Sequence, residues 1–148
     1  MVNDINLRVS TAQAVTVTAV SVDSVDLQNA RDVGEGEDLY MVFTVGTAFT
    51  GGTSISFEVL IADNGPLTTN PTVLAASPAI PTAQLIAGSQ FAVRFSPVAS
   101  LRAPGAVRRF LGARYTVVGT MTAGTVTADV VHTIQGGNRF YPSGFTVL

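Results

Sequence analysis

Residues 54–62 read SISFEVLIA, and this stretch decides the fold class of the chain. Successive side chains of a β-strand point to opposite faces of the sheet, so a strand with one buried face alternates apolar and polar residues. The apolar side chains of this stretch share one face: Ile55, Phe57, Val59 and Ile61. The polar side chains share the other: Ser54, Ser56 and Glu58. The stretch therefore predicts a β-strand with one face in the core and one toward solvent.

The same period of two recurs elsewhere in the chain. Residues 91–96 alternate in this way, and residues 39–45 carry apolar side chains on both faces, which predicts a strand covered on both sides. In residues 13–22, QAVTVTAVSV, the phase changes between Val17 and Val20. A β-bulge or a crossing between two sheets would produce this change.

Turn signals rich in glycine separate the expected strands, and no window of helical length shows a 3.6-residue period. The most helix-like segment is residues 106–111, where a turn or two of helix is expected. Residues 113–121 and 125–134 flank Thr122-Ala123-Gly124, and a short loop that ends in glycine predicts a hairpin between them. About eight short strands indicate an all-β fold, a jelly-roll-like antiparallel β-sandwich.

The length of 148 residues suits one domain, and no linker-like stretch divides the chain. We therefore expect residues 1–148 to form a single β-sandwich domain, with candidate arms at residues 1–12 and 135–148. The N-terminal sequence MVNDINLRVS contains no apolar stretch of the kind found in secretory signal peptides.

Charge is the unusual feature of the composition. Charged residues make up 12% of the chain, against about 25% in ordinary soluble domains. No apolar run approaches the roughly 18 residues that a membrane helix needs, so no membrane partner is expected. The net charge is -2 and lysine is absent, which argues against nucleic acid as a partner. A surface with few charges costs little to desolvate, and this favours contacts with proteins.

The residue inventory argues against the common catalytic and metal sites. A phosphate-binding P-loop needs a lysine, and a zinc site usually needs several His or Cys ligands. The chain has one histidine, His132, and no cysteine. Asp129 is the acid nearest to His132, but residues three apart on a strand face opposite sides. We interpret His132 as a packed histidine at a strand end, and we expect a protein that is not an enzyme and holds no cofactor or metal.

Two charged clusters are candidate binding sites. The acidic cluster comprises Asp32, Glu35, Glu37 and Asp38. The favoured interpretation is a solvated turn, and the alternative is a calcium site, although the spacing is not that of an EF-hand loop. The basic cluster lies in LRAPGAVRRFLGAR and comprises Arg102, Arg108, Arg109 and Arg114. Arginine binds carboxylates through paired hydrogen bonds and tolerates burial in interfaces. These arginines are therefore candidate protein-interface residues, and a solvated loop with scattered charge is the alternative.

The C-terminal stretch GGNRFYPSGFTVL is rich in aromatic residues, and its candidate interface residues are Phe140, Tyr141 and Phe145. Apolar rings of this size need to be buried. They either pack back onto the sandwich of this domain or form an arm that lies over a neighbouring molecule.

Several stretches resemble a known phage protein family. They read STAQAVTVTAVSVDSVDL, ARDVGEGEDLYMVFTVGTAFTGGTSISFEV, AIPTAQLIAG, RRFLGARYTVVGTMTAGTVTADVV and FYPSGFTVL, and together they cover nearly the whole chain. In them the chain resembles the capsid cement (decoration) proteins of short-tailed double-stranded-DNA bacteriophages, the family that includes the Bordetella phage jelly-roll cement protein. No site motif of that family can be matched residue by residue.

The resemblance implies a jelly roll on the outer surface of the virion that binds the major capsid protein and clamps neighbouring capsid subunits. It implies self-association as a homodimer, with a trimer as the alternative, and synthesis in the cytoplasm of the bacterial host. Two other functions stay open. One is another virion β-domain, such as a head-fibre base, tail or baseplate domain. The other is a carbohydrate-binding jelly roll, which the absence of Trp disfavours because sugar sites usually present exposed aromatic side chains.

Overall fold

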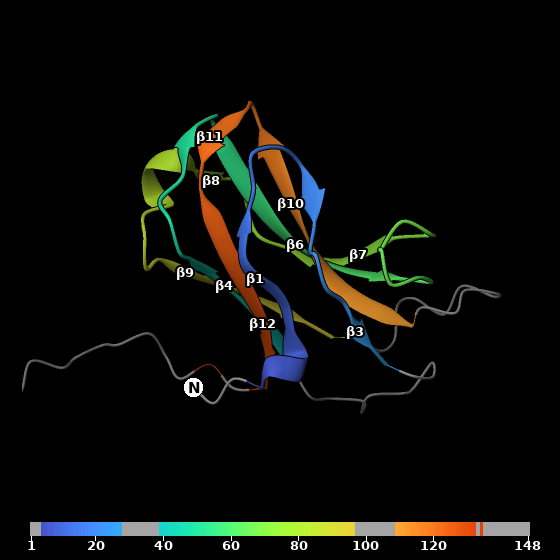
Figure 1. The fold of residues 1–148 in the computed structure, drawn as a ribbon. Coiled ribbons are helices and arrows are strands. Elements are labelled where there is room, and N and C mark those ends of the chain that lie inside the picture. The colour runs from blue at the N-terminus through green and yellow to red at the C-terminus, as the bar shows by residue number, and fades with distance from the viewer. Residues whose placement is uncertain (1–3, 28–38, 97–108, 133, 135–148) are drawn as a thin grey trace, which may run out of the picture.

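The computed structural model describes residues 4–27, 39–96, 109–132 and 134. In this part of the chain two antiparallel sheets pack face to face around one core (Figure 1). The first sheet has the order β1-β12-β4-β9, and the second has the order β2-β10-β6-β7, with β3 beside β10 and β8 beside β6. A small third sheet joins β11 to β5.

The strands and the two short 3₁₀ turns have the following bounds: η1 Ile5–Leu7, β1 Arg8–Ala14, β2 Ala19–Val20, β3 Val25–Asp26, β4 Leu39–Val45, β5 Thr50–Gly51, β6 Ser54–Ala62, β7 Thr72–Ala76, β8 Ile80–Pro81, η2 Thr82–Gln84, β9 Gln90–Phe95, β10 Phe110–Val118, β11 Met121–Ala123 and β12 Thr125–Val131.

The strand order is that of a jelly roll. Eight strands form the paths of the two main sheets, and the chain changes sheet after almost every one of them. Among these eight, only β6 and β7 follow each other in the chain and pair in the same sheet. Two interleaved Greek keys produce this alternation. The prediction of a jelly-roll-like antiparallel β-sandwich of about eight strands is confirmed.

Strand β6 is the strand predicted from SISFEVLIA, and it pairs along its whole length with β10. Its predicted inner face is buried, with Ile55, Phe57, Val59 and Ile61 at most 4% exposed. On the other face Ser56 and Glu58 are partly exposed, but Ser54, Leu60 and Ala62 are buried, so the predicted solvent-facing side is correct only in the middle of the strand. The period of two therefore identified the correct core face of this strand.

Four aromatic rings form the centre of the core and join the two sheets. Phe57 of β6 stacks on Phe43 of β4, with ring centroids 4.7 Å apart, and on Phe91 of β9, at 5.5 Å. Tyr115 of β10 meets Phe43 and Phe57 edge-on, each at 6.1 Å. Such pairs stabilise a core by about 0.5–1.5 kcal/mol beyond the area that they bury. Phe57 contacts all three of the other rings.

The change of phase in residues 13–22 is a crossing between the two sheets. Strand β1 ends at Ala14 in the first sheet, and β2 pairs with β10 in the second. Val15 is fully buried where the crossing begins, whereas Val17 and Val22 are exposed. Register shifts of β1 against β12 lie before this point, so a bulge-like irregularity is present as well but does not cause the change of phase.

Strand β4 has buried residues on both faces, as predicted. Met41 and Phe43 belong to the core, and Val42, which points to the opposite face, is 2% exposed. Tyr40 and Thr44 are partly exposed, so the outer face of this strand is covered over part of its length.

The predicted hairpin around Thr122-Ala123-Gly124 is wrong. Strand β10 lies in the second sheet and β12 in the first, and β11 between them pairs with β5. The period of two identified both arms as strands but carried no information about their partners, because pairing depends on distant segments. Gly119 and Gly124 turn the chain across the end of the sandwich at φ values of 85° and 142°, which L side chains rarely adopt.

Two smaller expectations also need correction. Phe110 and Leu111 were expected in a helical turn but are the first residues of β10, while residues 106–108 lie outside the described part. His132 was expected to be packed at a strand end, but β12 ends at Val131 and the His132 side chain is exposed.

The structure describes part of one of the two candidate arms. Within residues 1–12, residues 8–12 lie in β1, which pairs with β12, so this part belongs to the sandwich. The candidate arm at residues 135–148 lies outside the described residues, as does the acidic cluster of residues 32–38.

Candidate protein interface

Arg109, a candidate interface residue, forms an ion pair within the chain. It immediately precedes β10, and its Nε and NH2 groups donate to the two carboxylate oxygens of Asp26 on β3, each at 2.5 Å. Its guanidinium also lies 5.2 Å from the centroid of the Phe110 ring. Both side chains of the pair are about 40% exposed, at 42% and 38%, so the pair is a surface clamp between β3 and β10. Solvent screens exposed pairs of this kind, so they contribute little to the stability of a fold.

Arg114, in the middle of β10, also has an internal carboxylate partner. Its Nε donates to Oε2 of Glu58 on the neighbouring strand β6 at 2.6 Å, and the Thr116 hydroxyl donates to Oε1 of Glu58 at 2.9 Å. The two charged residues lie directly opposite each other in the register of the two strands. The carboxylate is thus satisfied on both oxygens at the outer face of the second sheet.

The structure therefore places two of the seven candidate interface residues, Arg109 and Arg114, and gives each a partner in this chain. It does not bring them into one cluster, because Arg109 pairs toward β3 and Arg114 toward β6. The others lie outside the described residues: Arg102, Arg108, Phe140, Tyr141 and Phe145. That these side chains dock on a partner stays a prediction.

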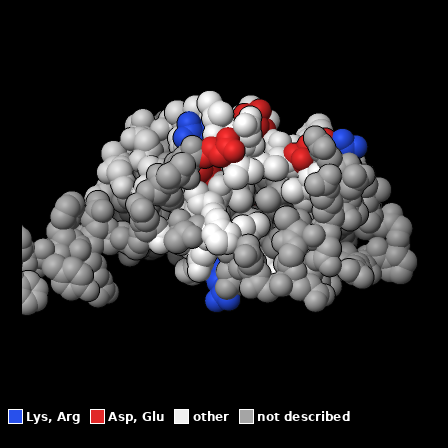
Figure 2. Space-filling view, turned by 90° about the horizontal axis from the view of Figure 1, so that it is seen from below, with Lys and Arg blue, Asp and Glu red and all other residues white. Residues whose placement is uncertain are grey.

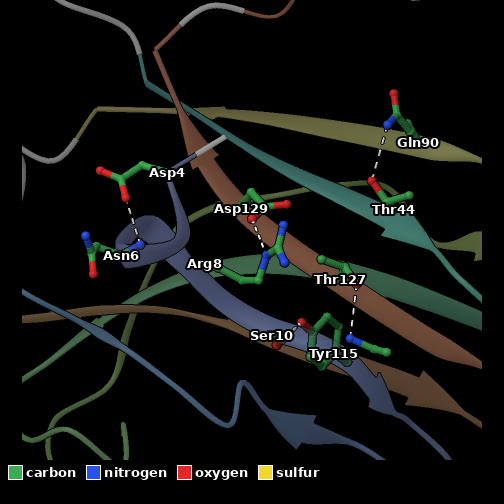
Figure 3. A network of polar contacts seen from close by, with 10 residues as sticks. Asp4, Asn6, Arg8, Ser10, Thr44, Gln90, Tyr115, Thr127 and Asp129 are labelled. Carbon is green, nitrogen blue, oxygen red and sulfur yellow. Dashed lines mark hydrogen bonds and ion pairs between the residues drawn. The ribbon is translucent and has the colours of Figure 1, made fainter. Parts of the chain in front are cut away.

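A partly buried ion pair that the sequence did not reveal joins β1 to β12. Nε of Arg8 donates to Oδ1 of Asp129 at 2.7 Å (Figure 3), and the two residues lie opposite each other in the register. The Asp129 side chain is 4% exposed and that of Arg8 is 28% exposed. The sequence drew attention to Asp129 only as a neighbour of His132. The available signal was a charged residue inside an otherwise uncharged strand, which must be paired when it is buried.

A second buried network connects the two sheets through Tyr115. The Tyr115 hydroxyl of β10 donates to Ser10 Oγ of β1 at 2.7 Å (Figure 3), and both residues are fully buried. Ser10 Oγ donates in turn to Oε1 of Gln13, which also accepts from the backbone N–H of Val22. Gln13 Nε2 donates to the carbonyl oxygen of Val20. The network fastens the segment that crosses between the sheets to β1 and β10.

Alkaline pH is expected to destabilise the protein through Tyr115. Burial raises the pKa of the Tyr115 hydroxyl above its ordinary value, and the hydrogen bond with Ser10 acts in the opposite direction. The Tyr115 hydroxyl ionises at a lower pH in the unfolded chain than in the folded protein. Its contribution to stability is therefore complete below about pH 10 and is lost as the pH rises further. Urea titrations at increasing pH should show the free energy of unfolding falling by up to about 1.4 kcal/mol per pH unit from this group.

The variant Tyr115→Phe separates this contribution from that of other groups. At neutral pH it should cost about 1 kcal/mol, because the hydrogen bond to Ser10 is lost inside the core. Above about pH 10 its stability should fall less steeply than that of the parent. Parallel curves for the two proteins would show that Tyr115 is not the group responsible.

Metal ligands do not gather in the described part of the chain, where no three His, Cys, Asp or Glu side chains come together. Within the same residues, no helix is long and apolar enough to cross a membrane.

The comparison with known proteins identifies a family. Residues 9–130 match the model of the Bbp16 family. The chain belongs to the Bbp16 family. This is a Bordetella phage protein family, so the phage family resemblance found in the sequence is confirmed. The match begins in β1 and ends in β12, and it therefore includes both sheets of the sandwich. No curated protein matches the chain.

Proposed function

We propose that this Bbp16 family protein is a capsid cement protein, a structural protein without enzymatic activity that binds the outside of the major-capsid lattice and stabilises the shell. The observation that carries the proposal is the family match, which spans the sandwich from β1 to β12. The jelly roll supports it, because two sheets packed around one close-packed core form a stiff module. The low charge of the chain, 12% of residues, also favours contacts with other proteins.

The proposed task is mechanical and needs no reacting group. Each bound copy adds its own binding free energy to the work of separating the subunits that it bridges, and a symmetric lattice repeats this gain many times. The proposed partners are the major capsid protein and a second copy of this chain, as a homodimer with a trimer as the alternative. Nucleic acid and membranes are not among them. The proposed location is the outer surface of the virion, after synthesis in the host cytoplasm.

The proposal predicts dense and saturable binding to shells that lack this protein. Purified protein is mixed with such shells, the particles are pelleted, and the bound copies are counted per shell against a titration series. Cement should saturate at a copy number on the order of hundreds, because every equivalent lattice site is filled. A handful of copies would instead indicate a fibre, tail or baseplate domain. Absence of binding, together with retention on a glycan array, would favour a carbohydrate-binding protein.

Heat tolerance is the second readout of the same experiment. Shells filled with packaged DNA should rupture or release DNA at a lower temperature without the protein, and re-addition should restore the parental temperature. Release is followed with a DNA-binding dye during a temperature ramp. Equal release temperatures with and without saturating protein would contradict a stabilising role even if binding is dense.

A further inference from the structure

Among the residues that the structure describes, one end of the sandwich carries no ionisable side chain. The jelly-roll topology brings four connections to this end, at the top of Figure 1, and their residues are 15–18, 46–53, 81–89 and 118–125. None of these residues is Asp, Glu, Lys, Arg, His or Tyr. We call the surface formed by these four connections the uncharged end.

The exposed side chains of the uncharged end are mostly apolar or hydroxylated, and Gln84 adds an exposed amide. Val17, Ile86 and Val118 are 56%, 61% and 52% exposed. Exposed threonines lie around them: Thr16, Thr18, Thr47, Thr50, Thr53, Thr120 and Thr122. Apolar groups gain free energy when they leave water, and hydroxyl groups lose far less than charged groups do. This surface is therefore inexpensive to desolvate.

Hydrogen bonds join the four connections to one another. The Met121 N–H donates to the Thr16 carbonyl at 2.9 Å, and the Thr53 N–H donates to the Val118 carbonyl at 2.8 Å. The Thr82 N–H donates to the Thr53 carbonyl at 3.1 Å. Backbone groups that are already paired need no partner on docking, and a surface held in one shape loses little conformational entropy when it binds.

Charged side chains lie elsewhere on the described part of the molecule. The Arg109–Asp26 pair joins β3 to the residue before β10, and the Arg8–Asp129 pair joins β1 to β12. Both pairs lie toward the strand ends opposite the uncharged end (Figure 1). Figure 2 looks onto that opposite end and shows acidic and basic side chains among the described residues. The described molecule is thus uncharged at one end of its strands and charged toward the other.

We propose that the uncharged end is the surface that docks on the shell, and that it contacts an uncharged patch of the capsid subunit. This inference rests on the proposed function and adds the orientation of the protein and the chemistry of its partner. We infer an uncharged partner patch because the uncharged end offers no counter-charge to a charged one. A charged patch pressed against the uncharged end would lose its water without gaining a counter-charge, which costs several kcal/mol per buried ion. The charged end then faces solvent.

The test compares variants that carry one added negative charge at the uncharged end with control variants that carry the same charge elsewhere on the surface. Val118→Asp and Ile86→Asp alter the uncharged end, and Val22→Asp and Ile5→Asp are their matched controls at 75% and 77% exposed positions outside it. Binding to shells that lack the protein is measured by pelleting, and folding of each variant by its Tm. All four positions are exposed, so Tm should change little. We expect the first two variants to bind at least about tenfold more weakly and the controls within about twofold of the parent.

Val118→Lys tests the chemistry of the partner by reversing the sign of the added charge. If the partner patch is uncharged, Val118→Lys and Val118→Asp should both bind the shells more weakly than the parent. If one sign strengthens binding, the partner patch is charged and the inference is overturned. It is also overturned if parental protein binds shells and both uncharged-end variants bind equally well, whereas failure of the parental protein to bind would refute the proposed function itself.

The uncharged end could instead bind a second copy of this chain, and sedimentation of the free protein tests this alternative. If Val118→Asp converts a parental dimer into monomers while shell binding is unchanged, the uncharged end is a contact between copies and the inference is wrong. If the oligomeric state is the same for parent and variant while shell binding falls, the inference holds.

Discussion

Replacing Phe57 by alanine is expected to lower the free energy of unfolding by about 3–5 kcal/mol, as for other large buried aromatic residues. The Phe57 ring is fully buried on β6 and contacts Phe43, Phe91 and Tyr115 across the interior. Its removal leaves a cavity between the two sheets and deletes three ring contacts at once. The surrounding side chains belong to paired strands, so the cavity can close only in part.

Urea unfolding followed by far-ultraviolet circular dichroism measures this loss. Phe91→Ala is the matched control, because Phe91 is only partly buried and its ring stacks on Phe57 alone among the described rings. It should cost clearly less than Phe57→Ala. Equal losses for the two variants, or a loss below about 1 kcal/mol for Phe57→Ala, would contradict the central position of this ring.

Gly124→Ala is expected to have the second largest effect, a loss of about 3 kcal/mol from overpacking and backbone strain together. Gly124 adopts φ 142° where the chain enters β12. A Cβ atom there would clash with Cδ1 of Phe49, whose side chain is 4% exposed in the core. The ring must move into a packed neighbourhood, or the connection at the uncharged end must shift.

Gly88→Ala is the control for the backbone contribution, since Gly88 also has a positive φ, 85°, but a Cβ there would meet nothing within 4 Å. Thermal unfolding should show a loss of about 1–2 kcal/mol for Gly88→Ala and a distinctly larger one for Gly124→Ala. In the background Phe49→Ala, Gly124→Ala should cost less than in the parent, because the ring that it meets is gone. Additive losses in that double variant would rule out the clash as the cause.

The fold class was predictable because a period of two is a local property. In β6 and β9 the alternation of apolar and polar residues reports which face is buried, whatever strand lies alongside. The change of phase before Val20 was visible for the same reason, although a bulge and a crossing between sheets produce the same signal. The hairpin at Thr122–Gly124 was mispredicted because a glycine-containing connection has the same local chemistry whether the strands pair or separate into two sheets.

The candidate interface was predictable only in part. Arg109 and Arg114 stood out as charges in a charge-poor chain, but their partners Asp26 and Glu58 lie 83 and 56 positions away. No local pattern connects residues at such separations. Asp129 was hidden for the same reason, because its partner Arg8 lies 121 positions away at the other end of the chain.

The sequence by itself determined that this protein is an all-β sandwich with few charges, because residue type and period are properties of neighbouring residues. The phage relationship came from the resemblance of whole stretches to a known family. The tertiary structure alone decided the strand partners, the burial of Asp129 beside Arg8 and the link from Tyr115 to Ser10. It also decided that four separate connections without any charge meet at one end. Their proximity follows from the jelly-roll winding, which depends on which sheet each strand joins and therefore on pairing between distant segments.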